Sequence, residues 1–161
     1  AADMTFTQRF QTFVCEGDSI SCEVAGFEII ARIVRDDCGD APDERHDGFW
    51  PSLYKDAPGF IGPGPNHRQR FAEAQARAEA SMDAWRKDEW FYFGIGLSVA
   101  LEGVMLDVHA ASLWGIEANY PDSDNAYLTE VAQELLPEAL DAGRAAARRL
   151  CAALETNGAR A

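Results

Sequence analysis

Four carboxylates recur at helical spacing in the last third of the chain. Glu130, Glu134, Glu138 and Asp141 are separated by steps of four, four and three residues. In an α-helix this spacing places all four on one face, roughly 6 Å apart along the axis. The repeat is similar to that of phosphates along a nucleic-acid strand, so the row could occupy a nucleic-acid-binding groove of another protein. The alternative is an ordinary solvated face, acidic in its first half and basic in its second half, as the helix dipole favours.

The surrounding charge distribution favours a basic protein as partner. The chain has a formal net charge of -13, and no Lys or Arg lies between Lys87 and Arg144. Eleven carboxylates fall in that stretch, and those nearest the helical row, which we include in the candidate partner-binding set, are Glu117, Asp122 and Asp124. Such a segment attracts cationic partners and repels nucleic acid. Direct nucleic-acid binding is disfavoured because phosphate contacts need clustered Lys and Arg.

A second set of residues could meet across a β-hairpin. If Glu102-Gly103 are the two turn residues, Ser98 lies opposite Asp107, and Gly96 lies opposite His109. Ser98, Asp107 and His109 are therefore candidate catalytic residues. However, Ser98 lies within a predicted strand and not at a sharp nucleophile turn, so a surface Asp–His pair is the competing interpretation.

The third set is an acidic loop, DDCGDAPDERHD, at residues 36–47. Carboxylates beside an imidazole could bind a divalent cation, and the candidate ligands are Asp37, Asp40, Asp43 and His46. Their spacing does not match an EF-hand, and a solvated acidic loop is the default interpretation. We therefore expect no metal and no cofactor.

Hydrophobic periodicity predicts the elements that must position these residues. Alternating apolar residues predict strands, and apolar residues three or four positions apart predict helices. The fold class expected is α+β: an antiparallel five-stranded sheet in the order βββ-loop-α-ββ-α, with two helices packed on one face. Pro137 should kink the last helix or split it in two. The single domain, 1–161, divides into a three-stranded meander (1–35, with strands at 5–15, 19–24 and 27–35), a long irregular loop (36–66), a helix (67–87), a hairpin (89–120) and a kinked helix (124–154).

Composition limits the setting of the protein. No stretch approaches the 18 or so apolar residues needed to cross a bilayer, and hydrophobic residues make up 47% of the chain, which is typical of a globular domain. The four cysteines follow no metal or redox spacing. These features predict a cytoplasmic protein with reduced thiols, no membrane partner and a monomeric or homodimeric state.

Parts of the sequence resemble a group of proteins from mobile genetic elements. DEWFYFG (88–94) and HAASLWGIEANYPDSDNAYLTEVAQELL (109–136), together with DGFWPS (47–52), are similar to small acidic hypothetical proteins carried by bacterial plasmids, integrative elements and phages. The resemblance implies a setting and no catalytic residues. Small acidic proteins on mobile elements include inhibitors of restriction and CRISPR systems, some of which imitate DNA.

Three hypotheses follow from these patterns. The first is a non-enzymatic acidic protein-binding module, DNA-mimic-like, that inhibits a nucleic-acid-binding or defence protein. The second is a small metal-dependent hydrolase or other enzyme that uses the 36–66 loop and the sheet face of Asp107 and His109. The third is a homodimeric structural or adaptor protein that associates through an aromatic sheet face.

Overall fold

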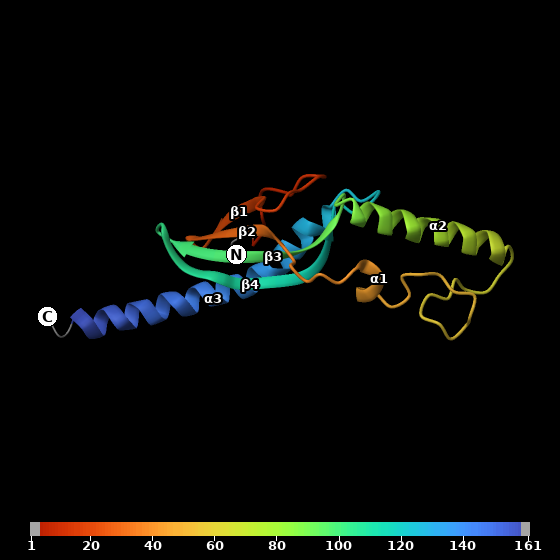
Figure 1. Ribbon diagram of the computed structural model, residues 1–161. Helices are drawn as coiled ribbons and strands as arrows, with labels where there is room; N and C mark the ends of the chain where they lie inside the picture. Colours follow the sequence, from red (N-terminus) through yellow and green to blue (C-terminus); the bar gives the residue numbers. More distant parts are fainter. Residues whose placement is uncertain (1–3, 159–161) are drawn as a thin grey trace. The chain divides into compact units, whose positions relative to one another are not determined.

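The computed structural model describes residues 4–158 and separates into two compact units (Figure 1). The first unit contains the chain up to Asp36, residues 92–119 and the chain from Ser123 onward. The second unit contains residues 37–91 and 120–122. The elements are β1 (Ser19–Val24), β2 (Phe27–Arg35), α1 (Pro42–Arg45), α2 (His67–Arg86), β3 (Phe91–Leu101), β4 (Val104–Ala118) and α3 (Ala126–Gly158).

The first unit is built on a four-stranded antiparallel sheet with the order β1-β2-β3-β4. Tight turns connect β1 to β2 and β3 to β4, so neighbours in sequence are neighbours in the sheet. Ile29 pairs with Val99 and Ile33 pairs with Ile95, and these side chains point to one face, where all four are buried. Burial alternates along β2, so every second residue from Phe27 to Ile33 lies on the covered face.

Helix α3 covers that apolar face. Its buried residues recur at intervals of three and four positions, which gives one apolar stripe along the helix. Helix and sheet approach closely at Gly143, because a Cβ at that position would lie 2.8 Å from a methyl of Val99. The buried stripe consists of Leu128, Ala132, Leu136, Ala139, Leu140, Gly143 and Ala146.

The predicted strand at residues 5–15 is wrong, and with it the prediction of a five-stranded sheet. Residues 4–15 contain no strand in this structure. The segment is instead held against the start of α3 and the end of β4 by side chains that bond its backbone. The Gln133 side chain accepts from the N–H of Phe6 at 2.9 Å and donates to the carbonyl of Met4. Thr129 accepts from the N–H of Phe10. Phe6 and Val14 are still buried, but the backbone bonds go to side chains and not to a neighbouring strand.

Two buried asparagines complete this attachment. Asn119 both donates to the carbonyl of Val14 and accepts from its N–H. Asn125, which is fully buried, donates to the carbonyl of Thr12 and to the side chain of Asn119. Both asparagines have positive φ angles of 60°, a conformation that Asn tolerates better than most residues.

The helices also differ from the prediction. Among the helices described in residues 4–158, α3 packs on the sheet of the first unit, and α2, the second helix predicted for that layer, belongs to the second unit. Helix α3 continues through Pro137 without a break, which excludes the predicted alternative of two separate helices. Pro137 lies on the exposed side, where water can bond the carbonyl that loses its helical partner.

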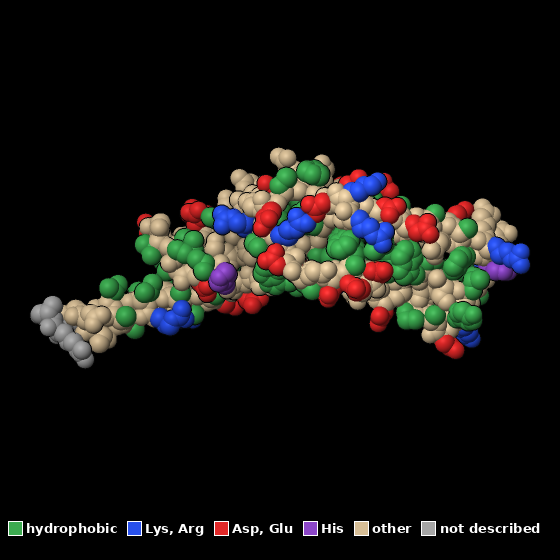
Figure 2. Space-filling view, in the orientation of Figure 1, with side chains coloured by type: hydrophobic (Ala, Val, Ile, Leu, Met, Phe, Trp, Pro, Cys, Tyr) green, Lys and Arg blue, Asp and Glu red, His purple; other side chains and the backbone are tan. Residues whose placement is uncertain are grey.

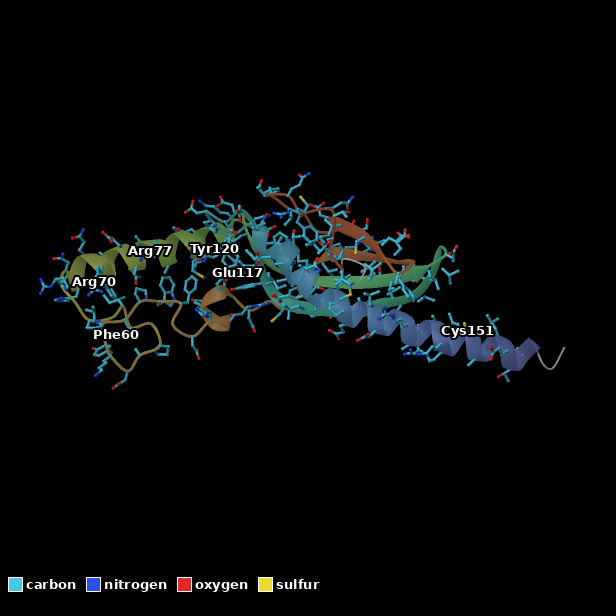
Figure 3. All side chains as sticks on the ribbon, turned by 180° about the vertical axis from the view of Figure 1, so that it is seen from behind. Phe60, Arg70, Arg77, Glu117, Tyr120 and Cys151 are labelled. Atoms are coloured by element: carbon cyan, nitrogen blue, oxygen red, sulfur yellow. The ribbon has the colours of Figure 1, made fainter. Side chains whose placement is uncertain are left out.

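The second unit consists of α2 and the ordered 37–66 segment beside it. The short helix α1 and an isolated bridge between Ser52 and Phe60 organise the segment. The guanidinium of Arg70 on α2 donates to four backbone carbonyls, at 3.0 to 3.3 Å, and so ties the end of the loop to the helix (Figure 3). The carbonyls belong to Ile61, Gly62, Gly64 and Pro65. Across residues 4–158, no helix is both long and apolar enough to cross a bilayer.

Candidate functional site

The acidic row on α3 forms an exposed face. Glu130, Glu134, Glu138 and Asp141 are all exposed, on the side of the helix opposite the buried stripe. Asp141 lies 3.9 Å from Arg144 in an exposed ion pair. No ion pair is recorded within residues 4–158 for the three glutamates. We call these four side chains the α3 acidic face; they combine one sign of charge with a rigid backbone, which is what a complementary cationic surface requires.

The three other acidic candidates are not part of this face. Asp124 accepts a hydrogen bond from the N–H of Ala126 at 2.9 Å and so caps the start of α3. Glu117 at the end of β4 is half-buried, and its charge acts on the phenol of Tyr127. Asp122 belongs to the second unit. Asp124 therefore has a structural role, and no residue pattern distinguishes these three acids from the α3 acidic face before the structure is known.

Tyr127 lies in the first turn of α3 and has an unusual environment. Burial, with the charge of Glu117 adding to it, raises the pKa of Tyr127 to about 12. The Ser123 side chain acts in the opposite direction and lowers the pKa. By the geometric criteria of a hydrogen bond, the phenol oxygen has no partner among residues 4–158.

The predicted meeting of Ser98, Asp107 and His109 is only partly realised. Glu102 and Gly103 do form the two-residue turn, with φ angles of 51° and 76° that define a type I′ hairpin. This turn sets Ser98 opposite Asp107. The carboxylate of Asp107, however, accepts from the backbone N–H of His109 at 2.9 Å, and no bond to the His109 ring or to Ser98 is recorded in the described chain. The arrangement thus lacks the base–nucleophile contact that acyl transfer needs.

The acidic loop does not assemble a metal site. No group of three or more His, Cys, Asp or Glu side chains positioned to hold a metal occurs within residues 4–158. Asp40 accepts from the thiol of Cys38, and Asp43 accepts from the indole of Trp50. Asp37 and His46 are exposed. The loop carboxylates instead organise their own segment.

The second unit contains a groove of about 720 Å³ along α2. Arg77 and Tyr120, labelled in Figure 3, lie in its wall, and the Tyr120 hydroxyl is 2.9 Å from the hydroxyl of Ser81. Buried Trp90 supports two of the lining residues: its indole donates to the carbonyl of Ser81, and its ring packs edge-on against Tyr120. His46 adds an imidazole. Since Glu89 and Asp122 also line it, the groove offers no preference for one sign of charge.

Sequence patterns did not reveal the outer edge of β4. β4 is the last strand of the sheet, so its outer edge has no strand partner within residues 4–158 (Figure 1). Large apolar side chains are exposed along it, and Figure 2 shows hydrophobic side chains gathered at the hairpin end of the sheet. They are Val104, Met105, Val108, Leu113 and Trp114. The long apolar run that follows the Glu102-Gly103 turn indicates these side chains in the sequence. The strand order is needed to show that the outer edge of β4 has no neighbouring strand.

Comparison with known proteins adds no relative. Searches against protein-family models, curated proteins and solved structures give no significant match. The resemblance to small acidic proteins of mobile elements therefore stays a prediction.

Proposed function

We propose that this protein is a non-enzymatic binding module whose α3 acidic face engages a basic surface of a partner protein. The observation that carries the proposal is the presentation of Glu130, Glu134, Glu138 and Asp141 on one exposed side of an unbroken helix. Helical geometry spaces them roughly 6 Å apart along the axis. A partner whose cationic groove normally holds a nucleic-acid backbone would meet a similar row of negative charges, so the proposed action is inhibition by imitation of DNA.

The proposed setting is the cytoplasm of a bacterium that carries a mobile element. The four cysteines, all within the described part of the chain, form no disulfide, which fits a reducing compartment. The partner class would then be a host defence protein or another nucleic-acid-binding protein. Charge complementarity would act mainly through the association rate and partner choice.

The test is affinity capture from a host lysate, followed by binding measurements with the purified partner. We expect one dominant nucleic-acid-binding protein, displaced by DNA and released as salt rises from roughly 0.05 to 0.5 M, because screening shortens the range of the field. Replacement of Glu130, Glu134, Glu138 and Asp141 by Lys should weaken binding at least about a hundredfold, since each introduced ammonium group then repels the basic partner.

A matched variant controls for net charge. Replacement of four exposed acids elsewhere by Lys changes the net charge by the same amount and should alter binding far less; these are Glu16, Glu23, Glu73 and Glu79. Circular dichroism must show that both variants are folded. Equal loss in the two variants, or unchanged binding by the folded α3 variant, would contradict the proposed role of the α3 acidic face.

A further inference from the structure

The outer edge of β4 carries backbone groups that can pair with another strand. In a type I′ hairpin the two residues that flank the turn, here Leu101 and Val104, form a hydrogen-bonded pair. Hydrogen-bonded positions alternate along an antiparallel strand, so the N–H and C=O groups of the even-numbered residues of β4 that follow Val104 point toward β3. Those of Met105, Asp107 and His109 therefore point outward and are not covered by side-chain burial, whereas Ala111, the next in the series, is buried. The bond from the N–H of His109 to the carboxylate of Asp107 agrees with this assignment, because that N–H is directed away from β3.

The side chains show that α3 leaves the hairpin end of this stretch, up to Val108, exposed, whereas Ala110 and Ala111 beyond it are buried. Val108 lies opposite buried Leu97, on the face that α3 packs against, but 58% of its surface is exposed. Val104 on the same side is 57% exposed, and Met105 on the other face is 48% exposed. A long apolar edge strand of this kind is a template for pairing with a further strand.

We infer that the occupant of this edge is β4 of a second copy of the chain, paired antiparallel about a two-fold axis at Val108. This register places Asp107 of each copy opposite His109 of the other. The two equivalent pairs lie on the same face of the joined sheet, one on each side of the axis. Each pair sets a carboxylate against an imidazole, and opposite groups of this kind stabilise antiparallel pairs. The two Val108 side chains meet at the axis.

Neighbouring registers lack this complementarity. An axis at Asp107 would set two Asp107 carboxylates directly opposite each other, which is destabilising. An axis at His109 would set the two imidazoles opposite each other and leave Asp107 facing Ala111. In the dimer the N–H of His109 bonds a carbonyl of the second copy, which releases the Asp107 carboxylate to meet the imidazole.

The inference does not rest on the proposed function, because it uses a different surface. The two also respond oppositely to salt. Each copy carries a formal charge of -13, so screening should strengthen self-association while it weakens a complex with a basic protein. Measuring self-association and partner binding over the same range of salt concentrations therefore tests the β4 dimer and the role of the α3 acidic face separately.

A disulfide trap tests the register directly. The full chain carries Val108→Cys with Cys15, Cys38 and Cys151 replaced by Ser, while buried Cys22 is kept. Val108 and its symmetry mate form a non-hydrogen-bonded pair, whose short Cα separation suits a disulfide. Mild oxidation should give a covalent dimer. A matched Ser19→Cys variant on β1, at the other edge of the sheet, should stay monomeric on a non-reducing gel.

A charge-swap series provides the second measurement, by sedimentation equilibrium. His109→Asp should weaken the dimer about tenfold, because two attractive pairs become repulsive. The double variant Asp107→His with His109→Asp should restore it, since each carboxylate again faces an imidazole. A wild-type chain that is monomeric at its highest soluble concentration, a dimer without the Val108 cross-link, or a double variant no better than the single one would each overturn the inference.

Discussion

The buried phenol of Tyr127 shows how one side chain can link stability to pH. Its raised pKa of about 12 means that the folded state keeps the proton at pH values where the unfolded chain, with a pKa near 10, has lost it. The contribution to stability is thus fully present below pH 10 and is lost as pH rises toward 12. Denaturant titrations of wild type and Tyr127→Phe should therefore give free energies of unfolding that diverge between pH 10 and 12. In this range the wild type loses the stability that depends on the protonated phenol, and Tyr127→Phe does not.

The same variant has an expected effect at neutral pH. Because the Tyr127 hydroxyl is buried without a hydrogen-bond partner in the described chain, its removal should leave the free energy of unfolding unchanged or raise it by up to about 1 kcal/mol. Tyr54, which is exposed, offers the control Tyr54→Phe, for which no pH-dependent difference is expected. A neutral-pH loss of stability in Tyr127→Phe would show that the hydroxyl does have a partner.

At the scale of elements, Arg70 is the contact that converts a long irregular segment into an ordered one. Its guanidinium bonds four carbonyls of the loop, which otherwise has few regular backbone bonds. We expect Arg70→Ala to expose the segment at 61–65 to proteolysis and to destabilise the second unit by about 1–3 kcal/mol. Arg68→Ala, one exposed residue on the same helix, is the matched control. Equal protease sensitivity of the two variants would argue against the role of Arg70.

At the scale of the whole molecule, charge is the dominant property. The chain has 27 acidic and 14 basic residues, and the ion pairs Arg86–Asp83 and Arg144–Asp141 are both exposed. Self-repulsion therefore opposes folding, and salt should relieve it. We expect the thermal midpoint to rise by a few degrees as sodium chloride goes from roughly 0.02 to 0.3 M. The same series in potassium chloride controls for ion-specific effects. A thermal midpoint that falls with salt would mean that attractive ion pairs outweigh the self-repulsion.

Much of the architecture is local enough to be predicted from the sequence by itself. The turn at Glu102-Gly103, the strands at 19–24 and 27–35 and the helix beginning at His67 depend on periodicity and turn chemistry over a few residues. The exposure of the α3 acidic face follows in the same way, because the opposite side of that helix is apolar. Local patterns suffice here since each element's own side chains define its buried side.

Only the tertiary structure decided the state of residues 5–15 and of the β4 edge. The first segment has the side chains of a strand, but Asn119, Asn125, Thr129 and Gln133, more than 100 residues away, bond its backbone instead. Sequence spacing contains no record of such contacts. Likewise, the alternation along β4 predicts a strand without stating whether another strand lies beyond it. The loss of the predicted fifth strand leaves the sheet with the order β1-β2-β3-β4, and that order, not the residues of β4, exposes its outer edge.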